Sequence, residues 1–129
     1  MKVVERHPVD FTPDLHIAKL YQGNVMYQYN LDIDIVDVLI IYYLKMLKIY
    51  FTPQENDIFF LADDEQGHIY FSVNYEEFIS MCPLAKISKD DFYSRIDRLE
   101  KLNLIVSIED MERAYYKCTG LTDDIMEIF

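Results

Sequence analysis

The 129-residue chain is 51% hydrophobic and has only 3 Gly and 4 Pro, which favours one folded domain and excludes a disordered or linker-like chain. Its formal net charge of −11 opposes long-range attraction to nucleic acid and favours basic partners. Because no secretory signal is recognisable, we expect a cytoplasmic protein whose two cysteines, Cys82 and Cys118, are reduced and act as small buried apolar residues.

Residues 1–30 are interpreted as an N-terminal extension of mixed character, with a short strand over residues 24–30. The next segment, Asp34 to Ile49, has apolar residues at helical spacing, and Lys45 and Lys48 near its end suit the negative end of a helix dipole. The same lysines leave its apolar run short of the roughly 20 residues that a membrane span needs. We therefore predict no membrane segment here, but a long helix whose surplus apolar surface lies in the core or in an interface.

A hairpin is predicted next, with strands at Ile58–Ala62 and His68–Val73 around a polar loop that contains Gly67. Asn74 then offers a side-chain oxygen to free backbone N–H groups, and an acidic residue follows three positions later. These features predict a short helix over Tyr75–Cys82.

Ser88 repeats this capping pattern before a longer predicted helix, Lys89 to Leu102. Apolar residues on one face of that helix are expected to point inward: Phe92, Ile96 and Leu99. Asn103 follows the helix and can adopt the left-handed backbone conformation that often closes one.

Two strands are predicted after this helix, Leu104–Ile108 and Ala114–Leu121, with the polar connection "EDMER" between them. The tail "TDDIMEIF" has Thr122 as a possible N-cap and apolar residues behind it. We expect a short apolar-faced helix that docks on another element.

The stretch "FSVNYEEFISMCPLAKISKDDFYSRIDRLEKLNLI" resembles the winged-helix domains of phage and plasmid replication-initiation (replisome-organiser) proteins, and more loosely MarR-type regulators. The positions that carry this resemblance are Tyr75, Phe78, Ile87, Ser88, Lys89, Leu99, Glu100, Lys101, Asn103, Leu104 and Ile105.

The resemblance implies an α+β winged helix-turn-helix, with a long apolar first helix, a β-hairpin before the second helix and a two-stranded wing. It covers about Asp34 to Cys118, which we take as the winged-helix core, 34–118, of one domain over residues 1–129; the N-terminal extension and the apolar tail at 119–129 lie outside the resemblance. Because folds of this kind host many activities, the resemblance says less about function.

The outward face of the predicted recognition helix is more acidic than basic. At 100° per residue, its outward residues are Asp90, Ser94, Asp97, Arg98 and Lys101, with Asp91 on the flank. The predicted wing tip, residues 109–113, is also net acidic. DNA-binding surfaces usually present bases or neutral polar groups instead, because phosphate contacts supply much of the affinity.

The first hypothesis, led by the resemblance, is a nucleic-acid-associated accessory protein of a phage or mobile element, acting in replication or transcription regulation. Its candidate contacts to double-stranded DNA are Lys86, Lys89, Tyr93, Ser94, Arg98, Lys101 and Arg113. The competing interpretation is that these cations only pair with neighbouring acids, as Asp91 with Arg95 and Asp97 with Lys101.

The second hypothesis, led by the charge, is an acidic module that occupies the basic nucleic-acid-binding groove of another protein. Phage inhibitors of a host nuclease or polymerase, including anti-CRISPR proteins, are often small and acidic, which makes them an analogy for this class. The candidate partner-binding residues are Asp90, Asp91, Asp97, Glu109, Asp110 and Glu112.

Neither hypothesis includes catalysis. His7, His16 and His68 lack metal-ligand spacing, and no Gly-rich phosphate loop is present. We expect no enzyme, cofactor or metal, and a homodimer formed through the first helix or the C-terminal tail if the apolar surplus is an interface.

Overall fold

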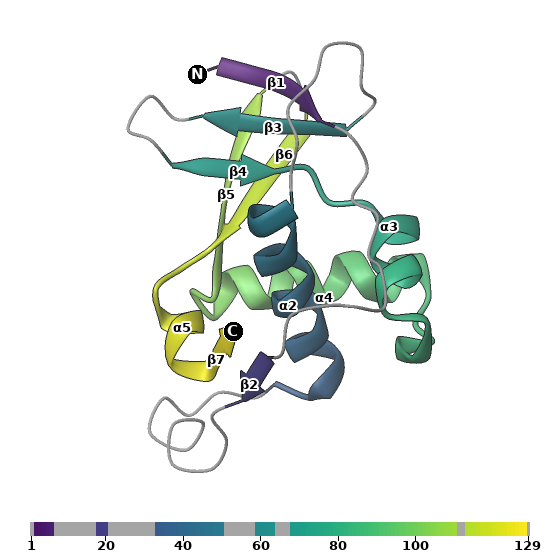
Figure 1. Cartoon of the computed structure of the whole chain (residues 1–129). Coiled ribbons are helices and arrows are strands. Elements are labelled where there is room, and N and C mark those ends of the chain that lie inside the picture. Colours follow the sequence, from purple (N-terminus) through teal and green to yellow (C-terminus); the bar gives the residue numbers. More distant parts are fainter. Residues whose placement is uncertain are drawn as a thin grey trace.

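The computed structural model describes residues 2–6, 18–20, 33–50, 59–63, 68–110 and 113–128. Their fold is α+β, as predicted, with an antiparallel sheet at one end of the molecule and helices below it (Figure 1). In spatial order the sheet strands are β1 (Lys2–Arg6), β3 (Phe59–Asp63), β4 (Ile69–Phe71), β6 (Arg113–Cys118) and β5 (Ile105–Asp110). A separate antiparallel pair joins β2 (Ala18–Leu20) to β7 (Met126–Ile128).

The helical elements follow the predicted order along the chain. They are α2 (Ile35–Tyr50), α3 (Tyr75–Met81), the short 3₁₀ helix η1 (Pro83–Ala85), α4 (Lys89–Lys101) and α5 (Leu121–Ile125). Figure 1 shows α2 in the middle of the molecule, with α3 and α4 beside it and the sheet above.

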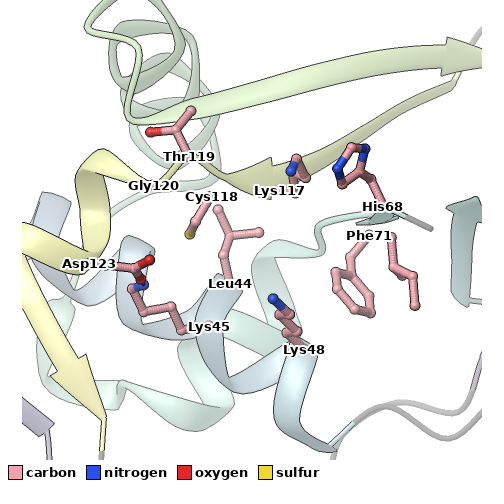
Figure 2. Close-up of a pocket in the computed structure, with 11 residues that line it drawn as sticks. Leu44, Lys45, Lys48, His68, Phe71, Lys117, Cys118, Thr119, Gly120 and Asp123 are labelled. Atoms are coloured by element: carbon pink, nitrogen blue, oxygen red, sulfur yellow. The ribbon is translucent and has the colours of Figure 1, made fainter. Parts of the chain in front are cut away.

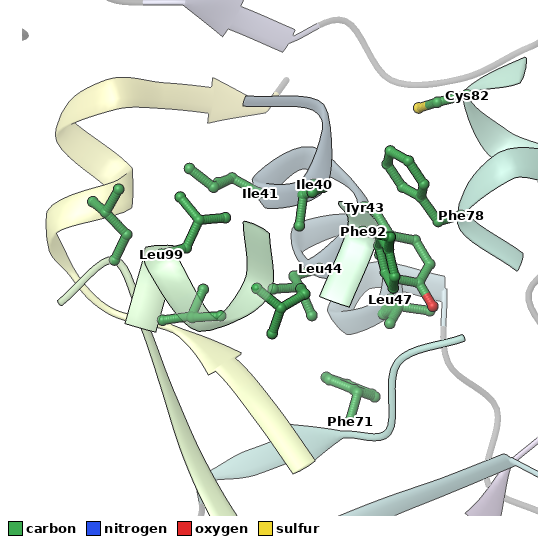
Figure 3. Close-up of a cluster of buried hydrophobic side chains, with 13 residues drawn as sticks. Ile40, Ile41, Tyr43, Leu44, Leu47, Phe71, Phe78, Cys82, Phe92 and Leu99 are labelled. Carbon is green, nitrogen blue, oxygen red and sulfur yellow. The ribbon is translucent and has the colours of Figure 1, made fainter. Parts of the chain in front are cut away.

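The long helix α2 supplies much of the core. Its fully buried side chains include Ile40, Ile41, Tyr43 and Leu47, and they pack with Phe78, Phe92, Leu99 and Leu104 from later elements (Figure 3). The apolar surplus of this segment is therefore buried largely within the chain itself. Ile35, which is 60% exposed at the first turn, is an exception.

Aromatic rings from α2, α3 and α4 pack against one another. Phe78 stacks on Phe92 with ring centroids 5.0 Å apart, and Tyr43 meets Phe78 edge-on at 5.7 Å. The buried Tyr43 hydroxyl donates to the buried Glu77 carboxylate at 2.5 Å. This hydrogen bond satisfies two polar groups that burial would otherwise penalise.

The helix ends agree with the predicted capping. The Asn74 side chain accepts from the Glu77 N–H at 2.9 Å, and the Ser88 hydroxyl accepts from the Asp91 N–H at 3.1 Å. Asn103 has φ 61° and its N–H donates to the Glu100 carbonyl, while the Leu104 N–H reaches back to Leu99. These two bonds form the Schellman closure that the asparagine predicted.

The predicted hairpin and the predicted wing belong to one sheet, because β4 pairs with β6 through Phe71 and Tyr116. Strand β1, which pairs with β3, was not predicted. Its five residues show no clear alternation of apolar and polar side chains. The strand predicted over residues 24–30 lies outside the described residues.

The tail differs from its prediction. The helix α5 begins one residue before Thr122 and ends at Ile125, and residues 126–128 form β7 instead of continuing the helix. Thr122 is buried, and its hydroxyl donates to the Thr119 carbonyl at 2.7 Å rather than capping the helix. Pairing with β2 supplies backbone hydrogen bonds that compete with helical ones, and local pattern cannot anticipate such a distant partner.

Candidate interaction surface

The orientation of α4 follows from its buried face. Phe92, Ile96 and Leu99 are at most 1% exposed, as predicted from their spacing. The opposite face is therefore turned to solvent, and six of its residues are exposed: Lys89, Asp90, Tyr93, Ser94, Asp97 and Lys101. Tyr93 is 37% exposed and packs edge-on against Phe92 at 5.0 Å.

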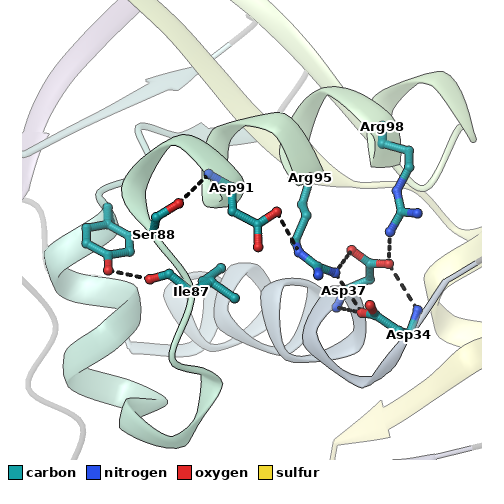
Figure 4. Close-up of polar contacts among 8 residues, drawn as sticks. Asp34, Asp37, Ile87, Ser88, Asp91, Arg95 and Arg98 are labelled. Carbon is teal, nitrogen blue, oxygen red and sulfur yellow. Dashed lines mark hydrogen bonds and ion pairs between the residues drawn. The ribbon is translucent and has the colours of Figure 1, made fainter.

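Two arginines of α4 turn instead toward the N-terminus of α2 (Figure 4). Arg95 Nη1 lies 2.7 Å from Asp34 Oδ1 and 3.0 Å from Asp37 Oδ1, and its Nε donates to Asp91 at 3.2 Å. Arg98 forms a short ion pair with the second oxygen of Asp37. Both oxygens of the fully buried Asp37 carboxylate thus accept from arginine.

The same two aspartates cap α2. The Asp34 N–H donates to Asp37 Oδ2, and the Asp37 N–H donates to Asp34 Oδ1, each at 3.0 Å. This reciprocal arrangement satisfies free backbone donors at the helix start and places negative charge at the positive end of its dipole. The arginines therefore bind a pair of carboxylates that the helix has already positioned.

The electrostatics of this cluster favour its charged form. Burial raises the pKa of Asp34, but hydrogen bonds from Arg95 and from the Asp37 backbone outweigh burial, so that the pKa falls below the ordinary 3.8. The hydrogen bond from Asp34 is likewise the largest cause of a raised pKa at Arg95. Both groups stay ionised at neutral pH.

This network bears on the predicted ion pairs and on one predicted contact. The Asp91–Arg95 pair forms, whereas Asp97 and Lys101 make no ion pair with any residue in the described part of the chain. Arg98, a candidate phosphate contact, has its guanidinium engaged by Asp37, although its side chain is 42% exposed.

The exposed face of α4 adjoins the β5–β6 hairpin around Tyr116, where acidic side chains of both elements lie. Burial raises the pKa of Tyr116 on β6, and the negative charges of Asp97, Glu100 and Glu109 raise it further. These three carboxylates therefore lie near one phenol, although they come from two different elements. Glu100 also accepts a short hydrogen bond from the Ser107 hydroxyl of β5.

The other predicted residues lie around this surface. Lys86 is exposed in the turn before α4, and Arg113 is exposed at the start of β6, opposite Asp110 in the strand register. Glu112 lies outside the described residues. The structure thus brings six α4 candidates onto one exposed face: Lys89, Asp90, Tyr93, Ser94, Asp97 and Lys101. Asp91 and Arg98 belong instead to the ion-pair network at the start of α2.

No protein-family model, curated protein or solved structure matches this chain. The resemblance to replication-initiation proteins therefore stays a prediction, and no residue role comes from a relative.

The two thiols lie in environments that favour their protonated form. Burial raises the pKa of Cys82 and of Cys118 to about 11, and both cysteines are free. In the described ranges no three His, Cys, Asp or Glu residues are grouped as metal ligands. No helix of those ranges has the length and apolar character needed to cross a bilayer.

The sequence places Asp34 and Asp37 at the start of the long helix, where the helix dipole favours acids, but sequence reasoning missed their reciprocal cap and their arginine partners. Their spacing of three residues, directly before an apolar helix, is a capping signal that could have been read. Their arginine partners, some 60 positions away, could not, because only the packing of α4 on α2 brings them together.

Proposed function

We propose that the chain is a winged helix-turn-helix whose α4 and β5–β6 face is an acidic docking surface for the basic nucleic-acid-binding groove of a partner protein, of the nuclease or polymerase class. The observation that carries the proposal is the pairing of Arg95 and Arg98 with Asp34 and Asp37. Because of this pairing, two guanidinium groups of α4, the helix that would approach a duplex, are bound to aspartates of α2, while Asp90 and Asp97 of α4 stay exposed.

The order of elements supports the winged-helix part of the proposal. Helix α2 precedes a helix, a tight turn and a second helix, and the β5–β6 hairpin follows. In DNA-binding proteins of this architecture the second helix of the motif enters the major groove. Here that position belongs to α4.

The charge on this face supports the docking part. The exposed cations of α4 are Lys89 and Lys101, and Asp90 and Asp97 balance them. Glu109 on β5 is exposed and, like Asp97, acts electrostatically on Tyr116. These exposed carboxylates complement lysines and arginines that line a basic groove.

The experiment adds the protein to purified nucleases and polymerases and follows their binding of a labelled duplex by fluorescence anisotropy. A partner of the proposed class loses duplex binding when the protein is added. The variant Asp90→Lys/Asp97→Lys/Glu109→Lys should lose this effect, because it reverses the charges that meet the groove. The matched control is Glu76→Lys, an exposed acid of α3 outside this surface. Inhibition that survives the triple reversal contradicts the surface assignment.

Direct DNA binding is a second candidate, favoured by the exposure of Lys86, Lys89 and Arg113 around the same face. It requires duplex binding that weakens steeply with salt. Replacing Lys89 and Lys101 together by alanine should then abolish binding, and unchanged affinity would exclude this candidate.

A further inference from the structure

A pocket of about 300 Å³ lies on another part of the molecule, between α2, β4, the end of β6 and the turn before α5 (Figure 2). We propose that it binds a small organic phosphate of about mononucleotide size. None of the exposed α4 residues lines it, so the inference is independent of the function proposed above.

The pocket concentrates positive charge in an acidic protein. Three lysines line it, Lys45 and Lys48 from α2 and Lys117 from β6. Asp123 is its single acidic lining residue among the described residues. The lining therefore carries a formal charge of +2, three lysines less one aspartate, with His68 counted as neutral. The chain as a whole carries −11.

The three lysines differ in how they are held. Lys45 Nζ lies 2.6 Å from Asp123 Oδ1, and its side chain is only 14% exposed. Lys117 Nζ sits 5.8 Å from the centre of the Tyr70 ring. Lys48 is exposed and makes no ion pair with any residue that the structure describes. Among the described residues no acidic partner balances Lys48 or Lys117, whereas Lys45 is balanced by its aspartate.

The charge and the shape together define the ligand class. A phosphate monoester carries about −1.5 to −2 at neutral pH, which matches the net lining charge better than one carboxylate does. Leu44, Ile69 and Phe71 supply an apolar wall beside the lysines. A pocket with an apolar wall and a few polar groups, at the small end of ligand sites, suits an organic part joined to the anion.

The thiol at the edge of the pocket is consistent with this arrangement. Cys118 lines the pocket, and its Sγ donates to the Ile41 carbonyl at 3.9 Å. The thiol is therefore held by the backbone of α2 and does not point a reactive group at the ligand. The lysines are left as the groups that recognise it.

The test is titration of the whole protein with adenosine monophosphate, followed by calorimetry and by the NMR amide signals of Thr119 and Gly120. Adenosine serves as the uncharged probe and inorganic phosphate as the bare anion. We expect adenosine monophosphate to bind and adenosine not to bind. Inorganic phosphate binding as tightly as the nucleotide would overturn the role of the apolar wall.

Variants then locate the binding. Lys48→Ala and Lys117→Ala should each weaken it about tenfold, the usual loss for one hydrogen bond to a charged group. Lys89→Ala, an exposed lysine of α4, is the matched control and should leave the affinity unchanged. Circular dichroism checks that every variant folds. If no phosphate compound binds at concentrations up to about 10 mM, which is far above the dissociation constants of functional ligands, the proposal is overturned. Equal loss in all three variants would also overturn it, because it would indicate only the global charge.

Discussion

Replacing Asp37 should destabilise the protein more than replacing any exposed acid of α4. The Asp37 carboxylate is 0% exposed, accepts from Arg95 and Arg98, and receives the Asp34 N–H at the start of α2. In Asp37→Ala all three bonds are lost; Arg98 is left facing an apolar methyl group, while Arg95 keeps its contacts with Asp34 and Asp91.

The magnitude follows from these contacts. A hydrogen bond to a charged group contributes about 1.5–3 kcal/mol, and a helix cap contributes about 1 kcal/mol. Breaking a buried ion pair costs about 3–5 kcal/mol, but Arg98 has a side chain 42% exposed and Arg95 one 19% exposed. Because water can solvate both arginines again, we expect the low end of that range, about 3 kcal/mol.

Urea unfolding at neutral pH measures this change. With a slope of about 2 kcal/mol per M, the midpoint should fall by about 1.5 M. Asp37→Asn keeps the shape but weakens both arginine contacts, and it should cost about 2 kcal/mol. Asp97→Ala is the control at an exposed site and should stay within about 0.5 kcal/mol of wild type. An Asp37→Ala midpoint equal to that of Asp97→Ala would refute the reasoning.

Three further predictions concern other groups. The pKa of Asp34 is lowered in the folded state. The carboxylate therefore stabilises the fold above its ordinary pKa of 3.8, and this stabilisation is lost as the pH falls through the folded value. Between pH 5 and 3 the urea midpoint of wild type should accordingly fall more steeply than that of Asp34→Asn. The pKa values of Cys82 and Cys118 are raised from 9.0 to about 11, so the folded protein should lose stability as the pH rises from about 9 to 11. At pH 8 the thiols of the folded protein should react with a maleimide far more slowly than those of the protein unfolded in urea. Equal rates would contradict their burial. Lys86 has φ 52°, where a Cβ costs about 1 kcal/mol, so Lys86→Gly should raise the thermal midpoint and Lys86→Ala should not; identical midpoints for the two variants would argue against strain at this turn.

Local signals in the sequence were enough to predict most elements around α4. Asn74, Ser88 and Asn103 mark helix ends through bonds to residues within five positions, so that the ends of α3 and α4 could be predicted closely. Periodicity also identified the buried face of α4, because Phe92, Ile96 and Leu99 obey the helical repeat.

What was missed depends on distant partners. Strand β1 forms because it pairs with β3, whose residues lie 53 or more positions further along the chain. Strand β7 forms because it pairs with β2. The Arg98–Asp37 ion pair joins α4 to α2. A prediction made from the helical periodicity of α4 alone cannot include that partner, and it therefore placed Arg98 on the outward face. The basic pocket gathers Lys45, Lys48 and Lys117 from two elements, and no local pattern announces it.

The central claim is that the α4 face docks on protein rather than on DNA. Fluorescence anisotropy of a labelled random duplex tests it most directly, at about 50 mM salt, where phosphate-driven binding is strong. Wild type should not bind. The variant Asp90→Lys/Asp97→Lys/Glu109→Lys should gain binding that disappears at about 200 mM salt, because the geometry stays and only the charge is reversed. Wild-type binding that disappears in Lys89→Ala/Lys101→Ala would contradict the account and identify the face as a DNA-binding surface.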